Sequence, residues 1–241
     1  MSWIRHTTPR KPPPLRAPPT PTLEPSTVRV ETPVEFPLQH LYEDTKDVYC
    51  LEQIDIILYI NLEKRFDRKQ HCVEEIKKID PFLLKTQRVN AVYQKENGAL
   101  GCTRSHIKAL QAFIDHPTWK TCLIMEDDFT FVFPSKETNQ SIDYALQQCK
   151  EFDVLLLGRG TQGYVSMSSP WNHIHQVVSA QTTSAYLVTK SYAPVLLANF
   201  QESEQLMLIR GYKPEYCLDN HWKRLMPSGK WFTLDYRIGY Q

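Results

Sequence analysis

This 241-residue sequence lacks the features that mark several large classes of protein. Its formal net charge is only +1, so it has no basic surplus of the kind that binds nucleic acid or an acidic membrane surface. No stretch approaches the roughly 20 consecutive apolar residues of a transmembrane helix. The opening residues, MSWIRH, are followed by prolines rather than an apolar segment, so we expect neither a signal peptide nor a transmembrane segment.

The cysteines lack the spacing of a structural zinc site or a redox motif. There are six, with no C-x-x-C pair, and a chain of this length does not need a disulfide framework. Several lie among apolar neighbours, as buried thiols do. We therefore expect a reducing, cytoplasmic environment for Cys50, Cys72, Cys102, Cys122, Cys149 and Cys217.

Proline is concentrated in the first part of the chain. Ten of the 17 prolines lie between Pro9 and Pro37, and this segment has no periodic apolar residues. Such a composition predicts a disordered or polyproline-II-like tail, which acts as a tether or docks a proline-reading partner. We therefore divide the chain into a tail over residues 1–47 and a single folded domain over residues 48–241.

In the rest of the chain, apolar residues follow two patterns in turn. Apolar runs of strand length alternate with segments whose apolar residues recur at helical spacing. This alternation predicts an α/β fold with a mainly parallel sheet, helices on both faces and a ligand site at the carboxyl ends of the strands. We expect strands at 54–60, 87–92, 121–125, 154–158, 177–178, 185–188 and 231–236, and helices at 67–79, 98–115, 138–150 and 192–200.

Three adjacent carboxylates follow one of these strands. Residues 121–128 read TCLIMEDD, an apolar run that ends in Glu126, Asp127 and Asp128. Neighbouring carboxylates repel one another unless a cation offsets the repulsion, and hard divalent ions take oxygen ligands of this kind. The motif therefore predicts a Mg²⁺ or Mn²⁺ site, although a solvated acidic turn would have the same sequence.

A basic segment follows the first strand. Asn61 comes at the end of that strand, and Arg65 and Arg68 lie at the turn into the next helix, on the sheet edge where the acids are expected. Arginine side chains and a helix N-terminus together favour phosphate binding. The alternative is a solvated loop whose cations cap the local fold.

The helix expected at 98–115 begins with the sequence GALGCTRSH. Its two glycines do not have the G-x-G-x-x-G spacing of a dinucleotide-binding loop. Arg104 flanks the apolar stripe of this helix, so we expect it to pair with a carboxylate such as Asp127 or with a ligand phosphate. His106 could contribute to the same site, or it could be a hydrogen-bonded structural histidine.

An isolated acid late in the chain is a further candidate. Asp219, in the sequence LDNHW, could serve as a general base beside a metal–diphosphate site. It could equally be the N-cap of a helix that runs to Leu225. The sequence leaves both roles open.

Several of these segments, taken in order, resemble glycosyltransferase family 25, which includes lipooligosaccharide-type bacterial transferases, viral members and collagen galactosyltransferases. The resemblance implies a GT-A-like, Rossmann-type fold, a nucleotide-sugar donor and an inverting reaction helped by a divalent metal. It covers about residues 54–236, through segments 60–62, 88–92, 98–106, 123–128, 153–158 and 183–188 together with Arg65, Arg68 and Asp219.

By this resemblance, Glu126 and Asp128 have the metal-binding role of the family's acidic triplet, and we assign Asp127 to the cofactor site. Asp219 is our candidate for the catalytic base. Many relatives continue beyond the position of Gln241, and we expect a missing segment there to weaken closure over the donor. The remaining cofactor-binding residues are expected to be Asn61, Arg65, Arg68, Arg104 and His106.

The resemblance implies transfer of a hexose, galactose or glucose, from a UDP-sugar to a hydroxyl on a glycan, a lipid-linked saccharide or a protein, with Mn²⁺ or Mg²⁺ as the ion. Lipopolysaccharide biosynthesis is one setting for such a reaction. A rival of another class is a scaffold or binding protein that keeps the fold without turnover. A nucleotidyltransferase is a further rival, but it should have a glycine-rich, lysine-bearing loop where this chain has residues 61–68, which contain no glycine.

Overall fold

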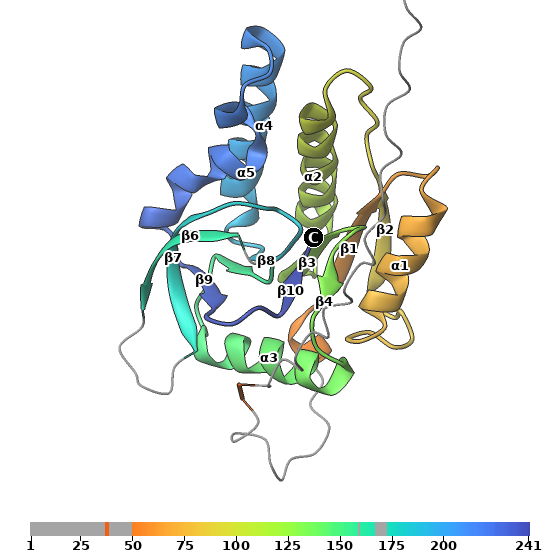
Figure 1. Cartoon of the computed structure of the whole chain (residues 1–241), viewed down its shortest axis with the longest axis vertical. Coiled ribbons are helices and arrows are strands. Elements are labelled where there is room, and N and C mark those ends of the chain that lie inside the picture. The colour runs from red at the N-terminus through yellow and green to blue at the C-terminus, as the bar shows by residue number, and fades with distance from the viewer. Residues whose placement is uncertain (1–36, 39–49, 159, 167–172) are drawn as a thin grey trace, which may run out of the picture. The chain divides into compact units, whose positions relative to one another are not determined.

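The computed structural model describes residues 37–38, 50–158, 160–166 and 173–241 (Figure 1). The chain divides into two compact units, Met1–Glu35 and Phe36–Gln241, and the described residues all belong to the second. The predicted tail over residues 1–47 thus lies outside the described residues, apart from Pro37 and the buried Leu38. The division of the chain at residue 48 stays a prediction.

The second unit contains an eight-stranded sheet, a two-stranded sheet and helices. The large sheet consists of β1 (Ile56–Asn61), β2 (Thr86–Asn90), β3 (Thr121–Glu126), β5 (Val154–Leu156), β6 (Thr161–Ser166), β7 (Ile174–Ala180), β8 (Ala185–Thr189) and β9 (Trp231–Leu234). The small sheet pairs β4 (Thr130–Phe131) with β10 (Gly239–Tyr240). The α-helices are α1 (Phe66–Ile76), α2 (Gly98–Asp115), α3 (Ser135–Gln148), α4 (Ala193–Arg210) and α5 (Leu218–His221).

The large sheet has the strand order β2-β1-β3-β8-β5-β9-β7-β6. Strands β2, β1, β3, β5, β9 and β6 run in one direction, and β8 and β7 run in the other. The predicted class, an α/β fold with a mainly parallel sheet and helices on its faces, is confirmed. The chief irregularity is β8, which lies between β3 and β5 and is antiparallel to both.

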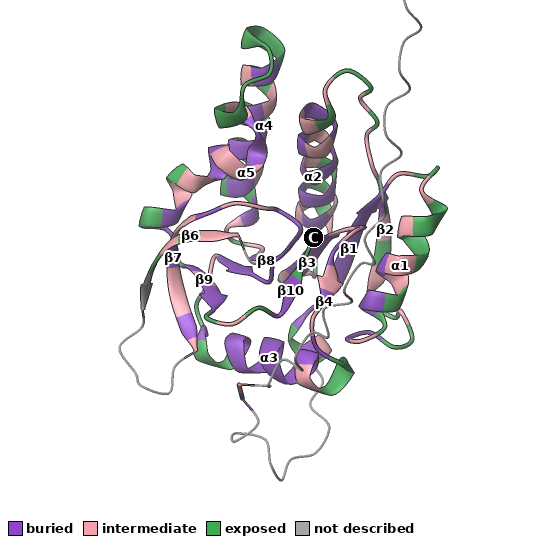
Figure 2. Ribbon diagram, in the orientation of Figure 1, coloured by how far each residue is buried: buried purple, intermediate pink, exposed green. Residues whose placement is uncertain are grey.

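Successive side chains of a strand point to opposite faces, so the sheet has two apolar cores. Ile57 and Tyr59 of β1 belong to a core that includes residues of α1 and α3, whereas Ile56, Leu58 and Ile60 belong to a core that includes residues of α2 and α4. Every residue of β1 is buried, and Figure 2 shows the exposed residues of α1 in green. Helices therefore cover both faces of the sheet. Among the described helices, none has the length and apolar character that a membrane crossing requires.

Helix α2 begins where the sequence predicts. The side chain of its N-cap residue, Asn97, accepts a hydrogen bond from Leu100 N at 3.0 Å. One turn further on, a Cβ atom at Gly101 would lie 2.7 Å from Val92 O, so only glycine allows this approach. Ser105 Oγ accepts a hydrogen bond from Val92 N at 2.8 Å. These contacts fix the first turns of α2 against the segment that follows β2.

Two helices extend beyond their predicted ends. Helix α3 begins at Ser135 rather than 138, directly after Pro134, and α4 continues from the predicted end at 200 to Arg210. Residues 201–210 include charged and polar residues of high helix propensity, which the apolar pattern does not detect. Gly211, with φ 77°, follows the end of α4, as glycine often does in this position.

Candidate functional site at the carboxyl edge of the sheet

The parallel strands bring Asn61 and the acids to one edge of the sheet. In the register of β1 with its neighbours, Asn61 pairs with Asn90 and Ile60 pairs with Glu126. Asn61 Nδ2 donates to Asp127 Oδ2 at 2.7 Å and to Arg65 O at 3.1 Å. Asn61 therefore connects the acidic triplet to the turn that precedes α1.

Asp127 is the most enclosed acid of the triplet, with 7% of its surface exposed. Besides the bond from Asn61, it accepts one from Arg68 Nη1, at 3.2 Å from Oδ1. The carboxylate is thus held by two side chains of the protein and is largely enclosed. A freely solvated acidic turn, the alternative interpretation of the motif, is therefore wrong.

Arg68 also contacts the last acid of the triplet. Its Nη1 lies 2.6 Å from Asp128 Oδ2, and Gln241 Nε2 donates to Asp128 Oδ1 at 3.0 Å. Burial raises the pKa of Asp128 above its usual range, the positive charge of Arg68 lowers it, and the negative charges of Glu126 and Asp127 raise it again, so the net direction is upward. The repulsion expected from the sequence is therefore present, and Arg68 offsets part of it.

Glu126, at the end of β3, has partners on both of its carboxylate oxygens. Oε1 accepts from Thr183 Oγ1 at 2.8 Å and lies 3.2 Å from His106 Nε2, while Oε2 lies 3.4 Å from Gln241 Nε2. Burial alone would raise the pKa of Glu126, but the hydrogen bonds and positive charge around it outweigh burial, and the pKa is lowered. The carboxylate is therefore favoured at this position.

The oxygens of two acids converge on a single donor, the amide of Gln241. Its Nε2 lies 3.0 Å from Asp128 Oδ1 and 3.4 Å from Glu126 Oε2. Strand β10, which pairs with β4, carries Gln241 to this point. Because both acids reach this position with one oxygen, a hard divalent cation fits there in place of the amide. The donor set of Glu126 and Asp128 is thus compatible with Mg²⁺ or Mn²⁺.

Arg65 lies further out. Its guanidinium pairs with Asp67, with Nη2 2.7 Å from Oδ2, and both side chains are largely exposed. Arg65 is also the N-cap residue of α1. Its pairing with Asp67 is the local contact expected if the basic segment is a solvated loop. Arg65 also borders a cavity described below.

Arg104 does not pair with Asp127, so that expectation is wrong. Its Nε lies 2.6 Å from Glu204 Oε1, which connects α2 to α4. Asp127 has Arg68 and Asn61 as partners instead. Of the two described cavities that Glu126 borders, Arg104 lines neither. A direct role of Arg104 toward a ligand stays a prediction.

Two cavities lie on either side of Glu126, and Glu126 and Cys102 border both. The larger, which we call the polar cavity, has a volume of about 570 Å³. The smaller, which we call the basic cavity, has a volume of about 310 Å³. Side chains that border the polar cavity include Gln181, Thr182, Thr183, Asp219, Arg237, Tyr240 and Gln241. Those that border the basic cavity include Arg65, Arg68, Tyr93, Gln94, Ser105, His106 and Asp127.

Asp219 borders the polar cavity and is not an N-cap. Helix α5 has Cys217 as its N-cap and ends at His221, where a 3₁₀ helix over Trp222–Ser228 begins. The alternative role of Asp219 as the N-cap of a helix to Leu225 is therefore wrong. Among the described residues, its carboxylate accepts one long hydrogen bond, from Thr182 N at 3.5 Å. Thr182 has a φ of 69°, an uncommon value for a β-branched residue.

His106 is fully buried, and both of its ring nitrogens have partners. Nδ1 lies 3.1 Å from Tyr186 Oη, and Nε2 contacts Glu126. The structure thus supports the alternative interpretation of His106 as a hydrogen-bonded structural histidine. This histidine nevertheless contacts the acidic cluster through Glu126. Sequence reasoning missed three neighbours of this cluster as site residues: Cys102, Tyr186 and Gln241. A signal existed for Cys102, because it lies one helical turn before His106.

Fold and site together define an α/β domain with an acidic cluster at the carboxyl edge of its sheet. An arginine neutralises part of the negative charge of this cluster, and two cavities adjoin it. No protein-family model matches the chain, and no curated protein matches it. Solved structures that align with the chain include a glycosyltransferase involved in glycosylation of the major capsid of PBCV-1, at 11% identity and a TM-score of 0.48 over 75% of this chain and 81% of that chain.

Two further structures align at lower similarity. A197 from STIV has 9% identity and a TM-score of 0.40, over 75% of this chain and 82% of that chain. A Bacillus anthracis protein assigned as a glucose-1-phosphate thymidylyltransferase, in complex with sucrose, has 10% identity and a TM-score of 0.36, over 77% of this chain and 70% of that chain. At these identities and scores, functional inference depends on the residues of the site.

Proposed function

We propose that this chain is a metal-dependent inverting glycosyltransferase, which moves a hexose from a UDP-sugar to a hydroxyl acceptor. The observation that carries the proposal is the convergence of Glu126 and Asp128 on one point, the Gln241 amide, beside the guanidinium of Arg68. The ordered resemblance to family 25 supplies the donor class. Galactose or glucose is the expected sugar, and a glycan, a lipid-linked saccharide or a protein is the expected acceptor.

Glu126 and Asp128 would hold Mn²⁺ or Mg²⁺ in the position of the Gln241 amide. When bound, the ion would supply Lewis-acid charge that stabilises the departing diphosphate. An ion at this point also gives Asp128 a second positive partner besides Arg68, which lies 2.6 Å away. The guanidinium, still held by Asp127, would then have more of its charge available for donor phosphates.

The basic cavity would hold the phosphates of the donor. Arg65 and Arg68 border it with guanidinium groups, which bind phosphate through paired N–H donors. Asp127 would act indirectly, since its bonds to Asn61 and Arg68 fix the position of that arginine. Tyr93, which is exposed and borders the same cavity, offers an aromatic face for the nucleobase.

The polar cavity would hold the acceptor. Asp219 and Glu126 both border it, together with the hydroxyls of Thr182 and Thr183. Asp219 would take the proton of the acceptor hydroxyl. As it does so, the acceptor oxygen would form a bond to the anomeric carbon, and the bond from that carbon to the UDP oxygen would break. Attack from the side opposite the leaving group inverts the anomeric centre.

The test is donor binding and hydrolysis by the purified chain with Mn²⁺, against a panel of UDP- and GDP-sugars. We expect one UDP-sugar to bind only with the metal, and Asp128→Asn to weaken this binding by at least about tenfold, which is 1.4 kcal/mol. Asp219→Asn should bind the donor normally and lose transfer, because a base acts after binding.

A matched control is Glu151→Gln, which removes an acid whose side chain is 82% exposed and pairs with Lys230. It should bind the donor as the unchanged chain does. The proposal is wrong if no nucleotide sugar binds, or if binding is indifferent to both the metal and Asp128.

A non-catalytic scaffold is the second candidate, and one observation favours it. Asp128 already has both oxygens in contact with Arg68 and Gln241, so the acids are satisfied without an ion. A scaffold of this kind would bind no donor and would be unchanged in stability by Mn²⁺. The donor panel therefore separates the two candidates.

A further inference from the structure

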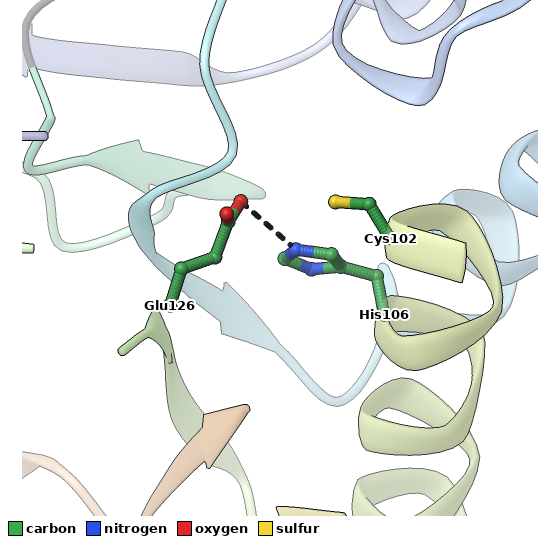
Figure 3. A group of neighbouring side chains, drawn as sticks. All are labelled: Cys102, His106 and Glu126. Atoms are coloured by element: carbon green, nitrogen blue, oxygen red, sulfur yellow. Dashed lines mark hydrogen bonds and ion pairs between the residues drawn. The ribbon is translucent and has the colours of Figure 1, made fainter. Parts of the chain in front are cut away.

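A thiol, an imidazole and a carboxylate converge beside the acidic cluster. The ligand atoms of Cys102, His106 and Glu126 all lie within 4.8 Å of one another (Figure 3). We propose that these three side chains form a separate site for a borderline-soft divalent cation such as Zn²⁺. This site is distinct from the position between Glu126 and Asp128, because it uses the opposite oxygen of Glu126.

The first support for this site is the rigidity of the elements that hold it. Cys102 and His106 are four residues apart on α2, so their side chains lie one above the other on the same helix face. Glu126 is the last residue of β3, a strand in the interior of the sheet. Regular elements therefore place all three ligands, which favours a preformed site.

The two oxygens of Glu126 face different neighbours. Oε1 is the atom near His106, at 3.2 Å from Nε2, whereas Oε2 is the atom near the Gln241 amide, at 3.4 Å. An ion beside Cys102 and His106 would thus use Oε1, and an ion beside Asp128 would use Oε2. One carboxylate lies between two potential cation positions.

The partner of the second ring nitrogen can orient His106 as a metal ligand. His106 Nδ1 lies 3.1 Å from Tyr186 Oη, inside the core. If Nδ1 donates to this hydroxyl, a neutral imidazole presents the lone pair of Nε2 to the carboxylate oxygen 3.2 Å away. In this tautomer an ion can bind between the two atoms, whereas in the other tautomer Nε2–H donates directly to Glu126 Oε1. Histidine ligands of metals are commonly oriented through the other nitrogen in this way.

The donor set selects the class of ion. Sulfur and imidazole ligands suit zinc and its relatives, whereas magnesium and calcium prefer oxygen alone. Cys102 and Glu126 border both cavities, so an ion has a path to the site and an open coordination position that water or a ligand oxygen can fill. Three protein ligands and one open position are the arrangement of catalytic rather than structural zinc sites.

The test uses Co²⁺ as a spectroscopic substitute for zinc, added to the full chain without nucleotide. We expect one ion per chain to give the charge-transfer absorption of a cobalt–thiolate bond, and excess Zn²⁺ to abolish this absorption. Cys102→Ala should lose this absorption entirely. The matched control, Cys149→Ala, removes a buried thiol at the end of α3 and should keep this absorption.

Two further variants test the orientation of His106, one by a change of a single hydroxyl group and one with a check that the protein is folded. Tyr186→Phe removes only the hydroxyl that contacts Nδ1 and should weaken Co²⁺ binding by about 10- to 100-fold. His106→Gln should weaken it at least as much, provided that its thermal unfolding shows a folded protein. Absence of the absorption in the unchanged chain, or its survival in Cys102→Ala, would overturn the proposal.

Asp128→Asn distinguishes this site from the proposed donor site. It should remove metal-dependent donor binding and leave the cobalt–thiolate absorption unchanged. The two proposals can therefore fail independently, although they share Glu126.

Discussion

Arg68 forms ion pairs with two of the three carboxylates of the acidic triplet. It contacts Asp127 at 3.2 Å and Asp128 at 2.6 Å, and its side chain is 39% exposed. Asp127, in contrast, is buried and depends on few partners. At the scale of single residues, the stability of the cluster without an ion thus depends on this arginine.

Replacing Arg68 by methionine tests this dependence. Loss of the guanidinium removes one hydrogen-bond donor from the buried carboxylate of Asp127, so we expect the free energy of unfolding to fall by about 1 kcal/mol. This value is at the low end of the usual cost of an unsatisfied buried group, because Arg68 is partly exposed. Mn²⁺ should then stabilise Arg68→Met more than the unchanged chain, since the ion replaces the missing charge. Thermal unfolding with and without Mn²⁺ measures both effects.

The control for this prediction is Arg65→Met. Arg65 pairs with Asp67 at the surface, so its loss should change stability by less than about 0.5 kcal/mol. Equal effects of Mn²⁺ on both variants would show that Arg68 does not neutralise the cluster.

At the scale of elements, the contact between α2 and α4 explains what Arg104 does. The guanidinium lies against Glu204 of α4, and the two side chains are 30% and 19% exposed. Helix α2 also carries Cys102 and His106, so the packing of α4 supports the helix that borders both cavities. Arg104 therefore acts in this geometry as a connection between helices.

Arg104→Met should lower the free energy of unfolding by about 1 kcal/mol, because it leaves Glu204 without its partner in a partly buried contact. Donor affinity should change by less than about twofold. Urea denaturation of Arg104→Met, Glu204→Gln and the double variant gives the coupling between the two residues. A large loss of donor affinity without loss of stability would instead favour the ligand role predicted from sequence.

At the scale of the whole molecule, buried thiols make stability depend on pH in the alkaline range. Burial raises the pKa of Cys72 and of Cys149 to about 12, against about 8.5 in an unfolded chain. Between these values the unfolded chain loses the proton and the native chain keeps it. A raised native pKa means that stability is intact below about pH 8.5 and falls as the pH rises toward 12.

Each such thiol should reduce the free energy of unfolding by up to about 1.4 kcal/mol per pH unit in this window. Cys149→Ala removes one of them, so its stability should fall less steeply between pH 8.5 and 10.5, as measured by urea denaturation. The difference in slope, rather than in absolute stability, separates ionisation from the cost of lost packing. Identical slopes would contradict the assignment.

Hydrophobic periodicity was sufficient to predict strands β1, β2, β3, β5 and β9, helices α1 to α4 and the edge where Asn61 and the acids meet, but it missed β6 and α5. It could not predict that β8 enters the sheet in reverse between β3 and β5, because direction and order depend on contacts between distant segments. The same limit applies to side-chain pairs. The Arg104–Glu204 and Gln241–Asp128 contacts join residues 100 and 113 positions apart, and no local pattern encodes them.

The reversed strand has a consequence for how the site opens. Strand β8 is hydrogen-bonded on both sides, so its amide protons should exchange with solvent only when the sheet unfolds, and Thr183 lies just before it. Strand β10 is two residues long and pairs with the two residues of β4, so it should exchange through fraying. We therefore expect one wall of the carboxylate site to persist as long as the fold does and the other to open more readily. An ion or a donor should then enter on the Gln241 side through that local opening, without any loss of the sheet.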